Sequence, residues 1–196
     1  MPREASVKRK TKETDITVSV KLDGTGQNRV RTGVGFFDHM LDLLGRHGML
    51  DLSVEAQGDT HIDAHHTVED VGICLGQALK QALGDLKGIG RYGEARVPMS
   101  EALATVALDV CNRPYLVFQA KFPAEKTGDF NADLVKEFFE ALANNAGITL
   151  HISLERGENL HHCIEAIFKA FARALDRATQ VDLRQKDLVP STKGVL

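Results

Sequence analysis

Several features are scarce in the sequence. Its 196 residues include no tryptophan, three cysteines and five prolines. Three scattered cysteines do not form a disulfide framework and favour a reducing compartment. No apolar run approaches the ~18 residues of a membrane span, so we expect no membrane partner. The net charge of −3 lacks the basic excess of nucleic-acid binders. The first residues carry no apolar core of a secretory signal, so we expect a cytoplasmic protein.

What the sequence does contain is typical of one globular domain. Hydrophobic residues make up 43% and charged residues 26% of the chain. The distribution of histidine is more informative, because all eight lie between positions 39 and 162 and four form two adjacent pairs. These pairs are His65-His66 and His161-His162.

Hydrophobic periodicity predicts the same order of elements twice along the chain. In the first part we expect strands at 15–22, 29–32 and 50–56 and helices at 36–44 and 65–83, with 29–32 as the hairpin partner of 15–22. In the second part we expect strands at 103–110, 115–120 and 147–154 and helices at 133–143 and 160–178.

The two parts also resemble each other in sequence. HHTVE at 65–69 aligns with HHCIE at 161–165, and LDLSV at 50–54 aligns with ITLHI at 148–152. The second alignment places His39 opposite Glu137. We therefore expect an α+β fold of two duplicated β-β-α-β-α halves, with helices packed between sheets. The halves would form a single domain over 1–196 from pseudo-repeats at about 9–95 and 96–190, followed by a short C-terminal tail.

The paired histidines begin predicted helices, and the helix geometry suggests what they bind. Residues four apart lie on one face, so His65 and Glu69 can hold one ion. A neighbour in sequence points ~100° away, so His66 would reach a different ion. The segment 161–165 repeats this arrangement. Two such motifs predict two metal ions.

Counting the ligands supports this prediction. Each motif supplies two histidines and one glutamate, and His39 and Glu137 raise the total to eight, or four for each ion. Imidazole and carboxylate ligands without thiolate favour Mn, Fe, Co, Ni or Zn, with open positions for substrate. The alternative is that the pairs are helix-capping or surface histidines. We interpret His151 as structural and His61, near Asp59 and Asp63, as a neighbour of the site.

Longer motifs give a more specific interpretation. They are FFDHMLDLLGRHG, GDTHIDAHHTVEDVGICLGQAL, GIGRYG, LHISLERGENLHHCIEAIFKAFARAL and the final PSTKGVL. Together with the Arg113-Pro114-Tyr115 turn, they resemble the imidazoleglycerol-phosphate dehydratase family from about Arg9 to Leu196. The resemblance implies a fold like domain 2 of ribosomal protein S5. It also implies a homo-oligomer of 24 subunits, with two manganese ions per active site at subunit interfaces.

The resemblance further implies the reaction and the residues that perform it. Water is lost from D-erythro-imidazole-glycerol phosphate to give imidazole-acetol phosphate, a step of histidine biosynthesis. The implied metal ligands are His39, His65, His66, Glu69, Glu137, His161, His162 and Glu165. The implied substrate-binding residues are Glu13, Arg91, Arg113, Lys169, Ser191 and Lys193. The implied catalytic residues are Glu13, His65, Glu69, His161 and Glu165. Members of the family often have histidine at the position of Glu137, where a glutamate oxygen can still bind Mn²⁺.

The chemistry of this reaction is consistent with these residues. The hydrogen to be removed lies on a carbinol carbon without an adjacent carbonyl, so elimination needs an electron source. We hypothesise that a metal-bound imidazole loses its N–H proton and expels the neighbouring hydroxyl. Glu13 would move protons, and Arg91, Arg113, Ser191 and Lys193 would hold the phosphate.

Three other functions fit the motifs less completely. A metal-storage protein would need no phosphate-binding residues. A dinuclear phosphate-ester hydrolase would release inorganic phosphate, whereas a dehydratase keeps the ester intact. A structural module with incidental histidines would bind no stoichiometric metal.

Overall fold

The computed structural model describes residues 2–196, and its first half contains four strands and two helices. These are β1 (Glu4–Lys10), β2 (Thr14–Lys21), β3 (Asn28–Arg31), α1 (Gly35–His47), β4 (Asp51–Gly58) and α2 (His65–Leu83). The second half repeats this order and adds a two-stranded hairpin before its first helix. Its elements are β5 (Tyr92–Met99), β6 (Ala102–Val110), β7 (Tyr115–Gln119), β8 (Lys126–Thr127), β9 (Phe130–Asn131), α3 (Asp133–Ala146), β10 (Ile148–Arg156) and α4 (Leu160–Thr179).

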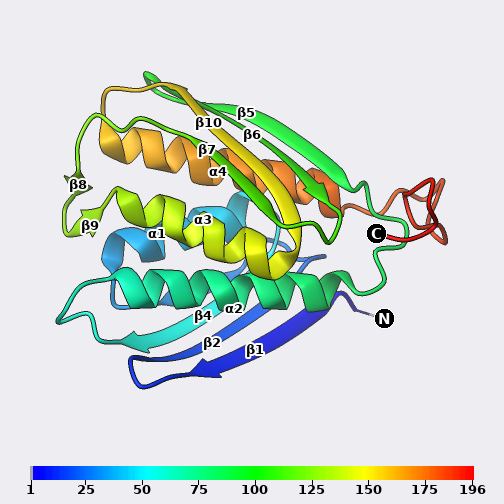
Figure 1. The fold of residues 1–196 in the computed structure, drawn as a ribbon, viewed down its shortest axis with the longest axis horizontal. Coiled ribbons are helices and arrows are strands. Elements are labelled where there is room, and N and C mark those ends of the chain that lie inside the picture. The colour runs from blue at the N-terminus through cyan, green and yellow to red at the C-terminus, as the bar shows by residue number, and fades with distance from the viewer. Residues whose placement is uncertain (1) are drawn as a thin grey trace.

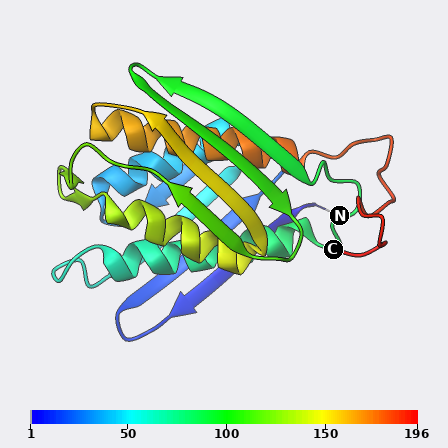
Figure 2. The same ribbon diagram turned by 45° about the horizontal axis from the view of Figure 1, so that its top comes forward.

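Two four-stranded sheets enclose the four helices (Figure 1). One sheet has the order β1-β2-β4-β3 and the other β5-β6-β10-β7. Turning the molecule shows α1 to α4 lying side by side in the layer between the sheets (Figure 2). The predicted α+β fold of duplicated halves is therefore confirmed.

The strand register shows how closely the halves correspond. In the first sheet Val18 pairs with Val54, and in the second sheet Val106 pairs with Ile152. The two edge pairs follow the same pattern, because β1 is antiparallel to β2 as β5 is to β6, and β3 is parallel to β4 as β7 is to β10. The sheets are therefore two copies of one topology.

The pairing of β3 differs from the one that the sequence predicts. Residues 29–32 do not form a hairpin with 15–22, because β3 pairs in parallel with β4 and Val30 lies opposite Val54. A parallel partner needs a long connection, and α1 supplies it between β3 and β4. Each half also begins with an additional edge strand, β1 or β5. Strand β1 buries only Val7, and the buried residues of β5 are the small Gly93 and Ala95, so neither strand shows a strong hydrophobic pattern.

One hydrophobic core joins the halves, and aromatic rings hold the helices in place within it. The ring of Phe138 in α3 packs against Phe37 of α1, with centroids 5.3 Å apart, and against Phe168 of α4 at 5.4 Å. All three side chains are fully buried. This cluster fixes α1 relative to α4, the two helices that carry the site described next. No helix within residues 2–196 has the length and apolar character needed to cross a membrane.

Candidate metal centre

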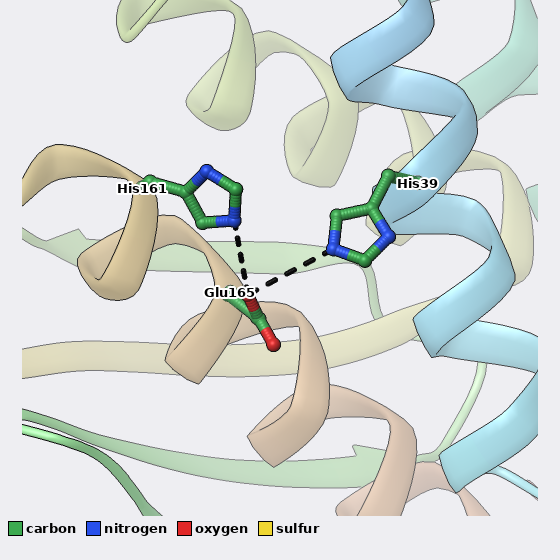
Figure 3. A group of neighbouring side chains, drawn as sticks. All are labelled: His39, His161 and Glu165. Carbon is green, nitrogen blue, oxygen red and sulfur yellow. Dashed lines mark hydrogen bonds and ion pairs between the residues drawn. The ribbon is translucent and has the colours of Figure 1, made fainter.

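Three of the predicted ligands meet at the start of α4. The Nε2 atoms of His39 and His161 lie 3.8 Å and 3.1 Å from Oε2 of Glu165. Figure 3 shows both imidazole rings directed toward this carboxylate from two different helices. One ligand atom from each residue lies within 4.8 Å of the others. Two imidazole nitrogens and one carboxylate oxygen at this spacing are a ligand set suited to a divalent transition ion.

The local sequence explains why these groups converge. His161 and Glu165 are four residues apart in α4, so their side chains share one face. The side chain of Asn159 caps this helix by accepting hydrogen bonds from the backbone N–H groups of His161 and His162. His161 also packs edge-on against Phe36 of α1, with ring centroids 5.1 Å apart. The cap and this contact fix the position of His161.

Lys169 adds a positive charge to this cluster from the next turn of α4. Its Nζ lies 2.5 Å from Oε1 of Glu165, and both side chains are mostly buried. Burial by itself raises the pKa of the Glu165 carboxyl, but the hydrogen bond and charge of Lys169, together with the charges of His39 and His161, outweigh it. The pKa of Glu165 is therefore lower than its ordinary value. The carboxylate is ionised at neutral pH, as a metal ligand must be.

The counterparts of these three residues in the duplication, His65, Glu69 and Glu137, form a more open arrangement. His65 Nε2 lies 4.0 Å from Oε2 of Glu69, one turn apart in α2. Glu69 and Glu137 line a cavity of about 270 Å³ between α2 and α3. Ile73 lines this cavity one turn after Glu69, whereas Lys169 lies one turn after Glu165. Within residues 2–196, only the cluster of His39, His161 and Glu165 brings three potential ligands so close together.

The second histidine of each pair contacts a different carboxylate. Nδ1 of His66 lies 3.0 Å from Oδ2 of Asp59, and this hydrogen bond raises the pKa of His66. Nδ1 of His162 lies 2.8 Å from Oε2 of Glu101. Backbone N–H groups of Asn159 and Glu158 also donate to Glu101, and these bonds lower its pKa to about 2.

The sequence alone does not reveal the partners of these second histidines. Glu101 is 61 positions from His162, and only the fold brings the turn between β5 and β6 to the start of α4. Asp59 is only seven positions from His66, but the sequence suggests it only as a neighbour of His61. The Gly58-Asp59 turn before the histidine pair is the signal in the sequence that points to Asp59. Glu13, in the turn between β1 and β2, lies nearby, since its carbonyl accepts the backbone N–H of Asp59 at 3.1 Å.

The predicted phosphate-binding residues lie at the other end of the molecule. Arg91 makes two hydrogen bonds to Asp109, of 2.7 and 3.1 Å, and donates to the carbonyl of Pro190 at 2.8 Å. Arg113 lies 3.7 Å from the same aspartate. Ser191 begins a turn in the tail, where its hydroxyl accepts the backbone N–H of Lys193 at 3.2 Å. Arg91 and Arg113 form a basic region together with Ser191 and Lys193 of the tail, and the tail is drawn in red in Figure 1.

Helix α4 gives the separation between the two ends. The backbone N–H of Arg91 donates to the carbonyl of Ala178 in the last turn of α4, whereas His161 lies in its first turn. At a rise of 1.5 Å per residue, these positions are about 25 Å apart along the helix. A single chain therefore does not bring its histidine cluster and its basic region together.

The fold and this cluster define a class of protein: a duplicated α+β protein with an imidazole and carboxylate site at one end. The family model for imidazoleglycerol-phosphate dehydratase matches residues 32–175. The chain is 60% identical over 196 residues to the imidazoleglycerol-phosphate dehydratase of Acetivibrio thermocellus and 57% identical to that of Geobacter sulfurreducens, each covering 100% of both chains. Among solved structures, the Staphylococcus aureus enzyme has a TM-score of 0.83 and 45% identity, covering 91% of this chain and 99% of that one. IGPD from Pyrococcus furiosus has a TM-score of 0.84 and 36% identity, covering 97% and 100%.

These similarities extend over nearly the whole chain. The chain belongs to the imidazoleglycerol-phosphate dehydratase family. It is an enzyme of histidine biosynthesis, a hydro-lyase, as the resemblance in its motifs implied.

Proposed function

We propose that this enzyme converts D-erythro-imidazole-glycerol phosphate to imidazole-acetol phosphate and water at a site that holds two Mn²⁺ ions. The observation that carries the proposal is the convergence of His39, His161 and Glu165 on a space fit for one ion. Bound there, a divalent cation supplies Lewis acidity and a fixed point of attachment for a nitrogen-containing substrate.

The duplicated fold suggests how the eight ligands divide between two ions. His39, His161 and Glu165 form one set, and their counterparts in the duplication, Glu137, His65 and Glu69, form the other. Each set combines one residue of one half with two residues of the other half. His66 and His162 lie outside both sets. Each of their rings is roughly perpendicular to the ring of the histidine before it in the sequence, and the two ring centroids are about 6 Å apart. We assign these two histidines to ions held by neighbouring subunits.

The remaining residues bind the substrate and move protons. Arg91, Arg113, Ser191 and Lys193 offer donors and positive charge to the phosphate, and Lys169 reaches the substrate from beside Glu165. A carboxylate such as Glu13 takes the proton from the carbinol carbon and passes it to the departing hydroxyl, which leaves as water. The enol that remains tautomerises to the ketone. His65, Glu69, His161 and Glu165 act by holding the reacting region in place.

The separation of the two ends supports active sites at subunit interfaces. The basic region lies about 25 Å along α4 from the histidine cluster, so one chain would meet the phosphate and another would meet the ring. A homo-oligomer satisfies this requirement, and on the family resemblance we propose that it has 24 subunits.

We further propose that residues 1–196 fold as one domain from pseudo-repeats at about 9–95 and 96–190. The three free, buried cysteines support a cytoplasmic location.

Elemental analysis with light scattering and a product assay tests this proposal. We expect about two Mn²⁺ per chain, an assembly near 24 chains and ketone formation without release of inorganic phosphate. His39→Ala or Glu69→Ala should lose metal and activity together, whereas His151→Ala, an exposed histidine on β10, serves as the matched control. Full turnover by either variant after chelation and dialysis would contradict the site assignment.

A further inference from the structure

Each histidine pair contains one ring whose inner nitrogen already has a partner. In the first half, Nδ1 of His66 lies 3.0 Å and 3.2 Å from the two carboxylate oxygens of Asp59. In the second half, Nδ1 of His162 lies 2.8 Å from Oε2 of Glu101. Both rings remain partly exposed, at 37% for His66 and 31% for His162. Within residues 2–196 neither Nε2 atom has a hydrogen-bond partner.

The two carboxylates come from different places in the duplicated fold. The pairings of Val7 with Val18 and of Ala95 with Val106 align the turn between β1 and β2 with that between β5 and β6. In this alignment the counterpart of Glu101 is Glu13, yet His66 contacts Asp59, from the connection between β4 and α2. The same contact therefore recurs with a carboxylate from a different element. Duplication alone would have placed Glu13 in that role.

The contact determines which ring nitrogen carries the proton. An ionised carboxylate only accepts hydrogen bonds, so Nδ1 must be the donor in both pairs. The lone pair of the neutral ring is then on Nε2, at the opposite side. A carboxylate held in this way also makes the ring a better ligand, as it does behind many metal-bound histidines.

We infer that Asp59 and Glu101 are positioning residues that fix His66 and His162 with Nε2 available to a divalent cation. The inference rests on the proposed metal dependence and adds two residues to the predicted site. Because Nδ1 is held by a carboxylate of its own chain, the second histidine of each pair has Nε2 free to bind a cation of a neighbouring subunit.

Glu101→Gln is the sharpest test, because neighbouring atoms fix the orientation of the new amide. Oε1 of Glu101 accepts backbone N–H groups from Asn159 and Glu158 at 2.8 and 3.2 Å. The amide oxygen stays at these donors, so its NH₂ group faces Nδ1 of His162 and donates to it. The proton of the ring then moves to Nε2, which blocks metal binding. Asp59→Asn lacks such an anchor and can turn its oxygen toward His66, so its effect should be smaller.

Calorimetric titration of the full metal-free chain with Mn²⁺ measures the effect. We expect Glu101→Gln to weaken one of the two binding events by about 10- to 100-fold. The matched control is Glu155→Gln. The carboxylate of Glu155 bonds Thr105 and Arg96 and contacts no histidine. ¹⁵N NMR of ring-labelled histidine, assigned with a His162→Gln variant, should show the proton of His162 on Nε2 in Glu101→Gln and on Nδ1 in the unsubstituted protein.

The outcomes separate this inference from the proposed function. If the unsubstituted chain binds no Mn²⁺, the proposed metal dependence fails. If it binds Mn²⁺ and Glu101→Gln binds equally well, or the His162 tautomer is unchanged, the positioning role is wrong. Weaker binding together with a lowered thermal midpoint of the metal-free variant also overturns it, since that result indicates a purely structural role at the start of α4.

Discussion

Glu165 shows how one side chain can be buried and still remain charged. Its side chain is only 8% exposed, a position that favours the neutral acid. Lys169, His39 and His161 surround it and stabilise the carboxylate. The equivalent glutamate of the first half, Glu69, is 45% exposed, and Ile73 takes the place that Lys169 has beside Glu165. The two equivalent glutamates therefore have different surroundings.

Replacing Lys169 should shift the pH dependence of metal binding. Lys169→Met removes the ammonium group that lowers the pKa of Glu165, and burial then raises that pKa. The carboxylate consequently takes up its proton at a higher pH, so binding should fail earlier as the pH is lowered. A titration of Co²⁺ absorbance between pH 4 and 8, a range that spans the carboxyl and imidazole pKa values, measures this shift. Lys87→Met, which removes the partner of Asp85 far from the cluster, should leave the curve in place.

The cysteines should be unreactive in the folded protein. Burial raises the pKa of the Cys74 thiol to about 11, and Cys111 and Cys163 are also buried. The thiolate is the reactive form, so a disulfide reagent at pH 8 should modify the native chain far more slowly than the unfolded chain, which exposes all three thiols. An added exposed thiol, Lys136→Cys on α3, should react at once. Rapid modification of native Cys74 would show that α2 opens readily.

At the scale of helices, α2 and α3 approach closely because α2 presents glycines to its neighbour. A Cβ atom on Gly72 would lie 2.8 Å from the carbonyl oxygen of Phe138, and one on Gly76 would lie 2.6 Å from that of Leu142. Both contacts are with backbone, which cannot move aside easily. This close approach brings Glu69 of α2 and Glu137 of α3 to one cavity.

Gly76→Ala should therefore destabilise the protein although alanine favours helix. The intrinsic gain is about 1 kcal/mol, and we expect the clash with α3 to exceed it and give a net loss of about 1–3 kcal/mol. Urea unfolding measures the difference. Gly35→Ala, in the first turn of α1 with open space around its Cβ position, is the control and should be neutral or stabilising. A stabilised Gly76→Ala would contradict the close packing.

The sequence predicted the elements with strong periodicity, including α2, α4 and both central strands of each sheet. It did not predict β1 and β5, because edge strands bury few side chains and their pattern is weak. Nor did it reveal Glu101, which lies 61 positions before His162 and reaches it only in the folded chain. By contrast, helix spacing alone predicts that His161 and Glu165 lie close together, because they are four residues apart in one helix.

At the scale of the whole molecule, the chain has two chemically different ends. The start of α4 carries the imidazole and carboxylate groups, and its last turn contacts Arg91 of the basic region. Figure 1 shows the C-terminal tail at this second end of the helix. The rigid helix between them keeps these ends apart. If both ends serve one substrate, each active site must combine different copies of the chain.

Mixing two inactive variants should then restore activity. His39→Ala damages only the histidine end and Arg113→Ala only the basic end, and both side chains are largely exposed, at 47% and 67%, so folding should be preserved. In randomly mixed assemblies of equal amounts, about a quarter of the shared sites combine two undamaged ends. Coexpression followed by a dehydratase assay should therefore recover up to that share of normal activity. As a control, coexpression of either variant with the variant that carries both substitutions should recover no activity. If coexpressed His39→Ala and Arg113→Ala are no more active than either variant alone, one chain builds the whole site.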